Sequence, residues 1–186
     1  MLCPGFIAVE RCQEVKRKVI RVLVVEDFKP FQEFICSALE KRPELEVICK
    51  AQDGSEAVQQ ARKLKPDLIV IDVGLPKVHG IEAIRQIREH VTKSIVLFVS
   101  QNSDADVVQR AFEVGGKGYV LKAQAGSDLL PAVEAVLGGQ RFVSGGLEAD
   151  GCTNSDKTTN HPHRQDRSQS SHKKVRDPLP PNPVTA

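Results

Sequence analysis

Short apolar runs alternate along the chain with segments in which apolar residues recur at the spacing of a helix. We predict β-strands for five apolar runs, at residues 19–25, 45–51, 68–71, 94–99 and 118–121. Apolar side chains at i, i+3, i+4 and i+7 predict helices between and after them, at residues 31–41, 55–64, 81–88, 104–114 and 127–137. Strands that alternate with helices in this way are typical of an α/β fold with a doubly wound parallel sheet.

Polar and special residues mark the predicted ends of these helices. Ser55 is interpreted as an N-cap, and Pro131 as a residue near the edge of the first turn of the last helix. Gly115 and Gly116 predict a left-handed C-cap for the helix before them. The buried stripe of the first helix is expected at Phe31, Phe34, Ile35, Ala38 and Leu39.

The run Leu68–Ile71 is continuous in branched apolar residues, with no polar alternation. Such a run fits a strand covered on both faces, which predicts the central strand of the sheet. The run stops at Asp72, and ligands of open parallel sheets bind at the carboxyl ends of their strands. An aspartate that closes a strand is more often a turn residue than a reactive group, so the other strand ends decide the interpretation.

The other strand ends also carry polar groups: Glu26 and Asp27, Ser100, and Lys122. Three carboxylates side by side repel one another unless a cation lies among them, and Mg²⁺ prefers such hard oxygen ligands. A hydroxyl and an ammonium supply the donors that phosphoryl transfer needs. A carboxylate can act as the nucleophile and form an aspartyl phosphate.

Taken together, these residues resemble the receiver domain of a two-component response regulator, over residues 19–143. The resemblance is carried by the acidic pair, by D-x-x-x-P from Asp72 with Gly80, by Ser100, and by the Tyr119-x-x-Lys122 ending. It implies a flavodoxin-like (βα)5 fold with a five-stranded parallel sheet of order 2-1-3-4-5. The run FVSQNSDADVVQRAFEVGGKGYVLK is similar to receivers of the nitrate-regulator type.

The resemblance also assigns roles to the residues at the strand ends. Asp72 resembles the phosphoacceptor, and Ser100 and Lys122 would contact the phosphoryl group. Glu26, Asp27, Asp72 and the Gly74 carbonyl would hold Mg²⁺. Tyr119 resembles the aromatic switch that turns inward when the Ser100 hydroxyl moves.

The implied partner is a sensor histidine kinase or a phosphotransfer protein. The output would pass to a second copy or to a downstream protein through the face at residues 104–137. Residues 1–18 show no clean period and are expected to be an extension, and residues 144–186 a disordered polar tail. Because no further amphipathic helix pair follows Ser144, direct DNA binding is not expected.

Composition narrows the remaining choices. The chain has 186 residues, 40% of them hydrophobic and 27% charged, and a formal net charge of +2. Its five cysteines are odd in number and scattered, which argues against a disulfide framework and favours a cytoplasmic location. No apolar run approaches the roughly 18 residues of a membrane span.

Three alternatives stand beside a phosphorylated receiver that is not itself an enzyme. A phosphatase on a similar sheet would need a second carboxylate two residues after Asp72, where Gly74 stands. The others are a scaffold receiver that signals without phosphorylation and the truncated remnant of a DNA-binding regulator. Lys77 and His79, in the loop after Asp72, are interpreted as a solvated charge and an exposed loop histidine.

Overall fold

The structure is a computed structural model that describes residues 19–145. The predictions for residues 1–18 and for the tail from residue 146 onward therefore lie outside the described residues. The strands are β1 (Ile20–Val25), β2 (Leu45–Ala51), β3 (Leu68–Asp72), β4 (Ile95–Ser100), β5 (Gly118–Leu121) and β6 (Phe142–Val143). The helices are α1 (Lys29–Leu39), α2 (Gly54–Leu64), α3 (Gly80–Arg88), α4 (Ala105–Glu113) and α5 (Ala125–Leu137), with a 3₁₀ turn at Lys122–Gln124.

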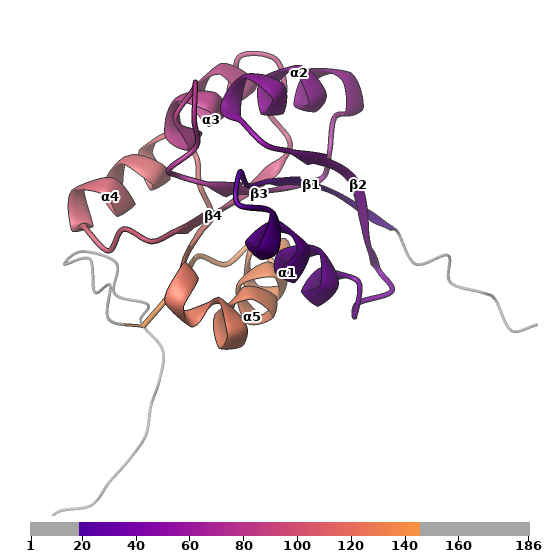
Figure 1. Cartoon of the computed structure of the whole chain (residues 1–186), viewed down its shortest axis with the longest axis vertical. Helices are drawn as coiled ribbons and strands as arrows, with labels where there is room; N and C mark the ends of the chain where they lie inside the picture. Colours follow the sequence, from indigo (N-terminus) through magenta and orange to yellow (C-terminus); the bar gives the residue numbers. More distant parts are fainter. Residues whose placement is uncertain (1–18, 146–186) are drawn as a thin grey trace, which may run out of the picture. The chain divides into compact units, whose positions relative to one another are not determined.

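The strands form one parallel sheet in the order β2-β1-β3-β4-β5-β6. Helices α1 and α5 cover one face of the sheet, and α2, α3 and α4 cover the other (Figure 1). The predicted doubly wound fold and the order of its first five strands are confirmed. None of the described helices has the length and apolar character needed to cross a membrane.

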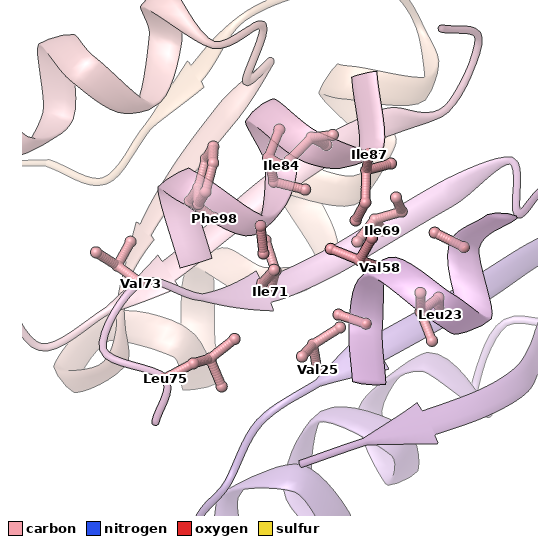
Figure 2. Close-up of a cluster of buried hydrophobic side chains, with 14 of the residues drawn as sticks. Leu23, Val25, Val58, Ile69, Ile71, Val73, Leu75, Ile84, Ile87 and Phe98 are labelled. Carbon is pink, nitrogen blue, oxygen red and sulfur yellow. The ribbon is translucent and has the colours of Figure 1, made fainter. Parts of the chain in front are cut away.

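The central strand β3 is buried on both faces, as its continuous apolar run predicts. Leu68 and Val70 pack in the cluster under α1 and α5, whereas Ile69 and Ile71 pack in the cluster under α2 and α3. All four side chains are fully buried, and each contributes about 1.5–3 kcal/mol through burial. Figure 2 shows Ile69 and Ile71 in one cluster with Ile84 and Ile87 of α3 and Val58 of α2. This packing fixes the strand whose last residue is Asp72.

Strand β6 was not predicted, because only two residues pair with the edge of β5. Phe142 pairs with Gly118, and Val143 pairs with Tyr119. The next residue, Ser144, is also buried: its N–H donates to the Tyr119 carbonyl, and its Oγ accepts from the Leu121 N–H. Ser144, one residue after the expected end of the domain, thus still satisfies backbone groups of β5.

Two helix starts differ from the sequence interpretation. The N-cap of α2 is Asp53, whose side chain accepts the Glu56 N–H at 2.8 Å, so Ser55 already lies inside the helix. Helix α5 begins at Ala125, directly after the 3₁₀ turn. Pro131 therefore lies in the helix interior rather than near its first turn.

The buried stripe of α1 is rotated relative to the prediction. Its buried residues are Gln32, Ile35, Cys36 and Leu39. Phe34 is 39% exposed and stacks on Phe31 with ring centroids 5.5 Å apart. The aromatic side chains thus lie beside the core, and a glutamine takes a buried position outside the predicted stripe.

Candidate functional site

Asp72 is the last residue of β3, and its side chain is 8% exposed. Its Oδ1 accepts the Gly74 N–H at 3.1 Å. The chain then returns to the strand end at Gly80, the first residue of α3. A Cβ at Gly80 would lie 2.0 Å from the Asp72 carbonyl oxygen, so only glycine fits there. The position of the Asp72 carboxylate is therefore fixed by the buried strand that ends there and by the loop that follows it.

Lys122 connects Asp72 with the end of β1. Its Nζ lies 2.9 Å from Asp72 Oδ2, 2.8 Å from Glu26 Oε1 and 2.7 Å from Glu26 Oε2. The Lys122 side chain is 12% exposed, and Nζ lies 4.9 Å from the centroid of the Phe31 ring. The lysine that follows β5 thus holds the carboxylates of β1 and β3 in one buried cluster.

Burial and charge act in opposite directions on these groups. Burial raises the pKa of the fully buried Glu26 carboxyl, and the negative charge of Asp72 adds to this, although Lys122 opposes it. Burial by itself would lower the pKa of Lys122, but its hydrogen bonds to Glu26 and Asp72 outweigh that effect and raise the pKa. One ammonium is thus shared by two buried carboxylates.

The three acidic residues Glu26, Asp27 and Asp72 have the chemistry of a cation site. Glu26, Asp27 and Asp72 each offer one carboxylate oxygen, and these oxygens lie within 4.8 Å of one another. Asp27 is exposed, which leaves an approach from solvent. Glu26 Oε2 is buried and lies 2.7 Å from Lys122 Nζ. A hard divalent cation fits three clustered carboxylates, because it prefers oxygen ligands.

Ser100 and Tyr119 contact the loop at residues 101–104 rather than Asp72. Ser100 ends β4, and its Oγ accepts the Asn102 N–H at 3.0 Å. Tyr119 is fully buried, and its hydroxyl donates to the Asn102 carbonyl at 2.8 Å. Burial raises the pKa of the Tyr119 phenol. The tyrosine is thus in an inward position, and both side chains hold the backbone of Asn102.

Lys77 is an exposed charge, as expected, and it also forms an ion pair that the sequence did not predict. It has a left-handed backbone, with φ of 63°, and its Nζ lies 2.6 Å from Asp53 Oδ2. The hydrogen bond with Lys77 lowers the pKa of Asp53 and raises the pKa of Lys77. The Asp53 carboxylate thus caps α2 and also anchors the loop after Asp72. His79, the N-cap residue of α3, is exposed, as expected.

The sequence interpretation missed three residues of the site, and each bonds through its backbone, to a backbone group or to a loop residue. They are Asn102, Asp53 and Gln32, whose amide lies below the acidic pair. Spacing gives no signal for the first two. The third has one, because Gln32 shares the helical stripe of Ile35, Cys36 and Leu39.

Comparisons with known proteins show the family to which this chain belongs. A family model for the response regulator receiver domain matches residues 22–134. The transcriptional regulatory protein DegU of Brevibacillus brevis is 31% identical over 131 residues, which are 70% of this chain and 56% of that protein. A protein-glutamate methylesterase/protein-glutamine glutaminase of Alkalilimnicola ehrlichii is 36% identical over 104 residues, 55% of this chain but 27% of that protein.

Solved structures show the same similarity. The crystal structure of a LuxR-family two-component response regulator from Aurantimonas sp. SI85-9A1 is 33% identical, with a TM-score of 0.66. The match covers 69% of this chain and 92% of that structure. The chain spans a little over half the length of a curated relative such as DegU.

Proposed function

This chain belongs to the response regulator receiver family of two-component systems, and we propose that it accepts one phosphoryl group on Asp72. The observation that carries the proposal is the contact of Lys122 with both Asp72 and Glu26 at the carboxyl end of the sheet. The donor would be a histidine kinase or a phosphotransfer protein that carries a phosphohistidine.

In the transfer, a carboxylate oxygen of Asp72 forms a bond to phosphorus. The N–P bond of the phosphohistidine breaks, and its electron pair stays on the imidazole nitrogen. Asp72 is held for this attack by the Gly74 N–H on Oδ1 and by Lys122 on Oδ2. Because the Lys122 ammonium keeps its proton, it can also balance negative charge on the incoming phosphoryl oxygens.

We propose that Glu26, Asp27, Asp72 and the Gly74 carbonyl hold Mg²⁺. The three carboxylates and the Lys122 ammonium carry a net charge of −3 + 1 = −2 when all are ionised. When bound, the ion would neutralise charge on the phosphoryl oxygens, as divalent metals do in other phosphoryl transfers. The chain's own part is to supply oxygen ligands that are already clustered.

The response to phosphorylation would involve Ser100, Lys122 and Tyr119. Added phosphate charge would attract the Ser100 hydroxyl and the Lys122 ammonium, and the Asn102 backbone is bonded to Ser100 and to Tyr119. This connection supports the expectation that the face at residues 104–137 changes and binds a second copy or a downstream protein. We infer a two-state switch that the phosphoryl group biases.

The alternatives receive less support from the site. The chain lacks a carboxylate at Gly74 for a phosphatase mechanism, and the methylesterase relative matches over only a quarter of its own length. We therefore propose a phosphoryl acceptor rather than an enzyme that acts on a separate substrate. A scaffold receiver would not need Lys122 buried between two carboxylates.

The test is intact-mass analysis after incubation with acetyl phosphate and Mg²⁺. The wild-type chain should gain one phosphoryl group, and Asp72→Asn should gain none because an amide oxygen is a poor nucleophile. Asp104→Asn is the matched control, since Asp104 caps α4 and asparagine caps equally well. Excess chelator should stop the labelling. Equal labelling of wild type and Asp72→Asn would exclude the proposed acceptor, and no labelling of wild type would favour the scaffold alternative.

A further inference from the structure

The buried side-chain amide of Gln32 contacts the backbone of the acidic pair Glu26 and Asp27. Gln32, on the first turns of α1, is 7% exposed. Its Nε2 donates to the Glu26 carbonyl at 2.9 Å and to the Ala51 carbonyl at 3.0 Å. The two N–H groups of one amide thus connect the carboxyl ends of β1 and β2 to α1.

These contacts fix the backbone that carries the acidic pair. The Glu26 carbonyl belongs to the peptide unit that joins Glu26 to Asp27, so its orientation sets the positions of both residues. The preceding peptide unit is held as well, because the Glu26 N–H donates to the same Ala51 carbonyl at 3.0 Å. Gln32 therefore completes the hydrogen bonding on both sides of Glu26.

A polar side chain at this position needs a reason, because its stripe neighbours Ile35, Cys36 and Leu39 are buried apolar residues. Burying an amide without partners costs free energy, whereas here both of its N–H groups have acceptors. Because the Gln32 amide donates to main-chain carbonyls, its influence on a cation at the cluster would pass through the backbone.

We propose that Gln32 is a positioning residue for the divalent cation site, which it orients through the Glu26–Asp27 peptide unit. This inference rests on the proposed function, because it requires that Glu26 and Asp27 hold Mg²⁺. Hydrogen bonds that orient metal ligands set the metal affinity in many proteins. Loss of the Gln32 amide should therefore weaken cation binding while Asp72 and Lys122 stay in place.

The test compares Mg²⁺ titrations of the full chain, followed by the amide NMR shifts of residues near Glu26. Gln32→Met keeps an unbranched side chain of similar length but removes both donors. It should weaken Mg²⁺ binding by about tenfold, at the lower end of what such losses cost metal sites. The rate of labelling by acetyl phosphate should approach the wild-type rate at saturating Mg²⁺, so the change lies in cation binding rather than in the chemical step.

Ile35→Val is the matched control. Ile35 is buried on the same helix, and the loss of one methyl group destabilises the same core without touching the carbonyls of Glu26 or Ala51. Its Mg²⁺ affinity should equal that of wild type. If Gln32→Met does not fold, Gln32→Asn decides by the same criterion, because its shorter amide cannot reach both carbonyls.

The outcomes separate this inference from the proposed function. Wild-type Mg²⁺ affinity in the folded Gln32 variant would overturn the positioning role while the receiver function stands. An equal loss of affinity in Ile35→Val would also overturn it, since general destabilisation would then explain the effect. A wild-type chain that neither binds Mg²⁺ nor accepts a phosphoryl group would instead refute the proposed function.

Discussion

Replacing Lys122 by methionine should destabilise the fold strongly, because it leaves Glu26 and Asp72 buried together without their shared cation. Methionine keeps an unbranched chain that can still pack near the Phe31 ring. The change therefore removes the charge and little of the packing.

The magnitude follows from the distances. With an effective dielectric constant of about 20, Nζ attracts Asp72 at 2.9 Å by about 6 kcal/mol and Glu26 at 2.7 Å by a similar amount. The two carboxylates, within 4.8 Å of each other, repel by at least about 3.5 kcal/mol. Protonation of Glu26 and entry of water limit the real loss. We expect about 3–5 kcal/mol, the range for removing one partner of a buried ion pair.

Asp72→Asn, in contrast, should change the free energy of unfolding only slightly. It gives up the attraction to Lys122, but it also removes the repulsion from Glu26 and the cost of burying a carboxylate. These effects nearly cancel, so the free energy of unfolding should stay within about 1 kcal/mol of wild type or rise. Added Mg²⁺ should stabilise Lys122→Met more than wild type, because a cation would replace the missing positive charge.

The assay is urea unfolding followed by circular dichroism, with chelator and then with millimolar Mg²⁺. Lys117→Met is the control, because Lys117 is exposed just before β5. Its unfolding midpoint should match that of wild type. If Lys122→Met in chelator were as stable as Lys117→Met, the ammonium would not hold the cluster together. A larger loss in Asp72→Asn than in Lys122→Met would refute the electrostatic reasoning as well.

Three further predictions concern residues around the site. Tyr119→Phe removes the bond to the Asn102 carbonyl and should cost about 1 kcal/mol and speed amide exchange at residues 101–104; unchanged exchange would contradict this role. Tyr119 is the only tyrosine and there is no tryptophan, so phenolate absorbance reports its pKa alone. Because burial raises that pKa, the folded chain binds the proton more tightly. The resulting stability is present below about pH 10 and is lost as pH rises through the folded pKa. Equal titration midpoints in buffer and in urea would refute it. Gly80→Ala should reduce acetyl phosphate labelling because its Cβ collides with the Asp72 carbonyl, whereas Gly126→Ala, with nothing within 4 Å, should label normally.

The sequence predicted the sheet and the polar residues at its carboxyl edge because both follow from strand ends. Once β1, β3 and β5 are parallel, the residues that follow them must meet at one edge, and Glu26, Asp72 and Lys122 do so. The apolar run of β3 is long enough to be recognised without knowledge of its neighbours. Strand β6 is not, because two residues give no periodicity.

The details that the sequence missed or misplaced depend on local backbone geometry, which spacing alone does not fix. Ser144 and Gln32 bond to main-chain groups of distant strands. Pro131 suggested a helix start because proline is tolerated in a first turn, but the 3₁₀ turn after β5 starts the helical path earlier. Asp53 caps α2 in place of Ser55 because the helix begins at Gly54 and the Glu56 N–H donates to the Asp53 carboxylate.

The site combines a rigid part with a part that can respond. Glu26, Asp72 and Lys122 are held at the ends of buried strands and by one another. The loop at residues 101–104 is instead held to Ser100 and Tyr119 by two hydrogen bonds, each of modest strength. The helix after it, α4, buries only Val108 and Ala111 of its residues, whereas α5 buries five. A new charge at Asp72 would therefore shift the loop at residues 101–104 and α4 more easily than the buried strands of the sheet. That difference in packing is the physical reason to expect the response to begin at α4, within the proposed output surface at residues 104–137.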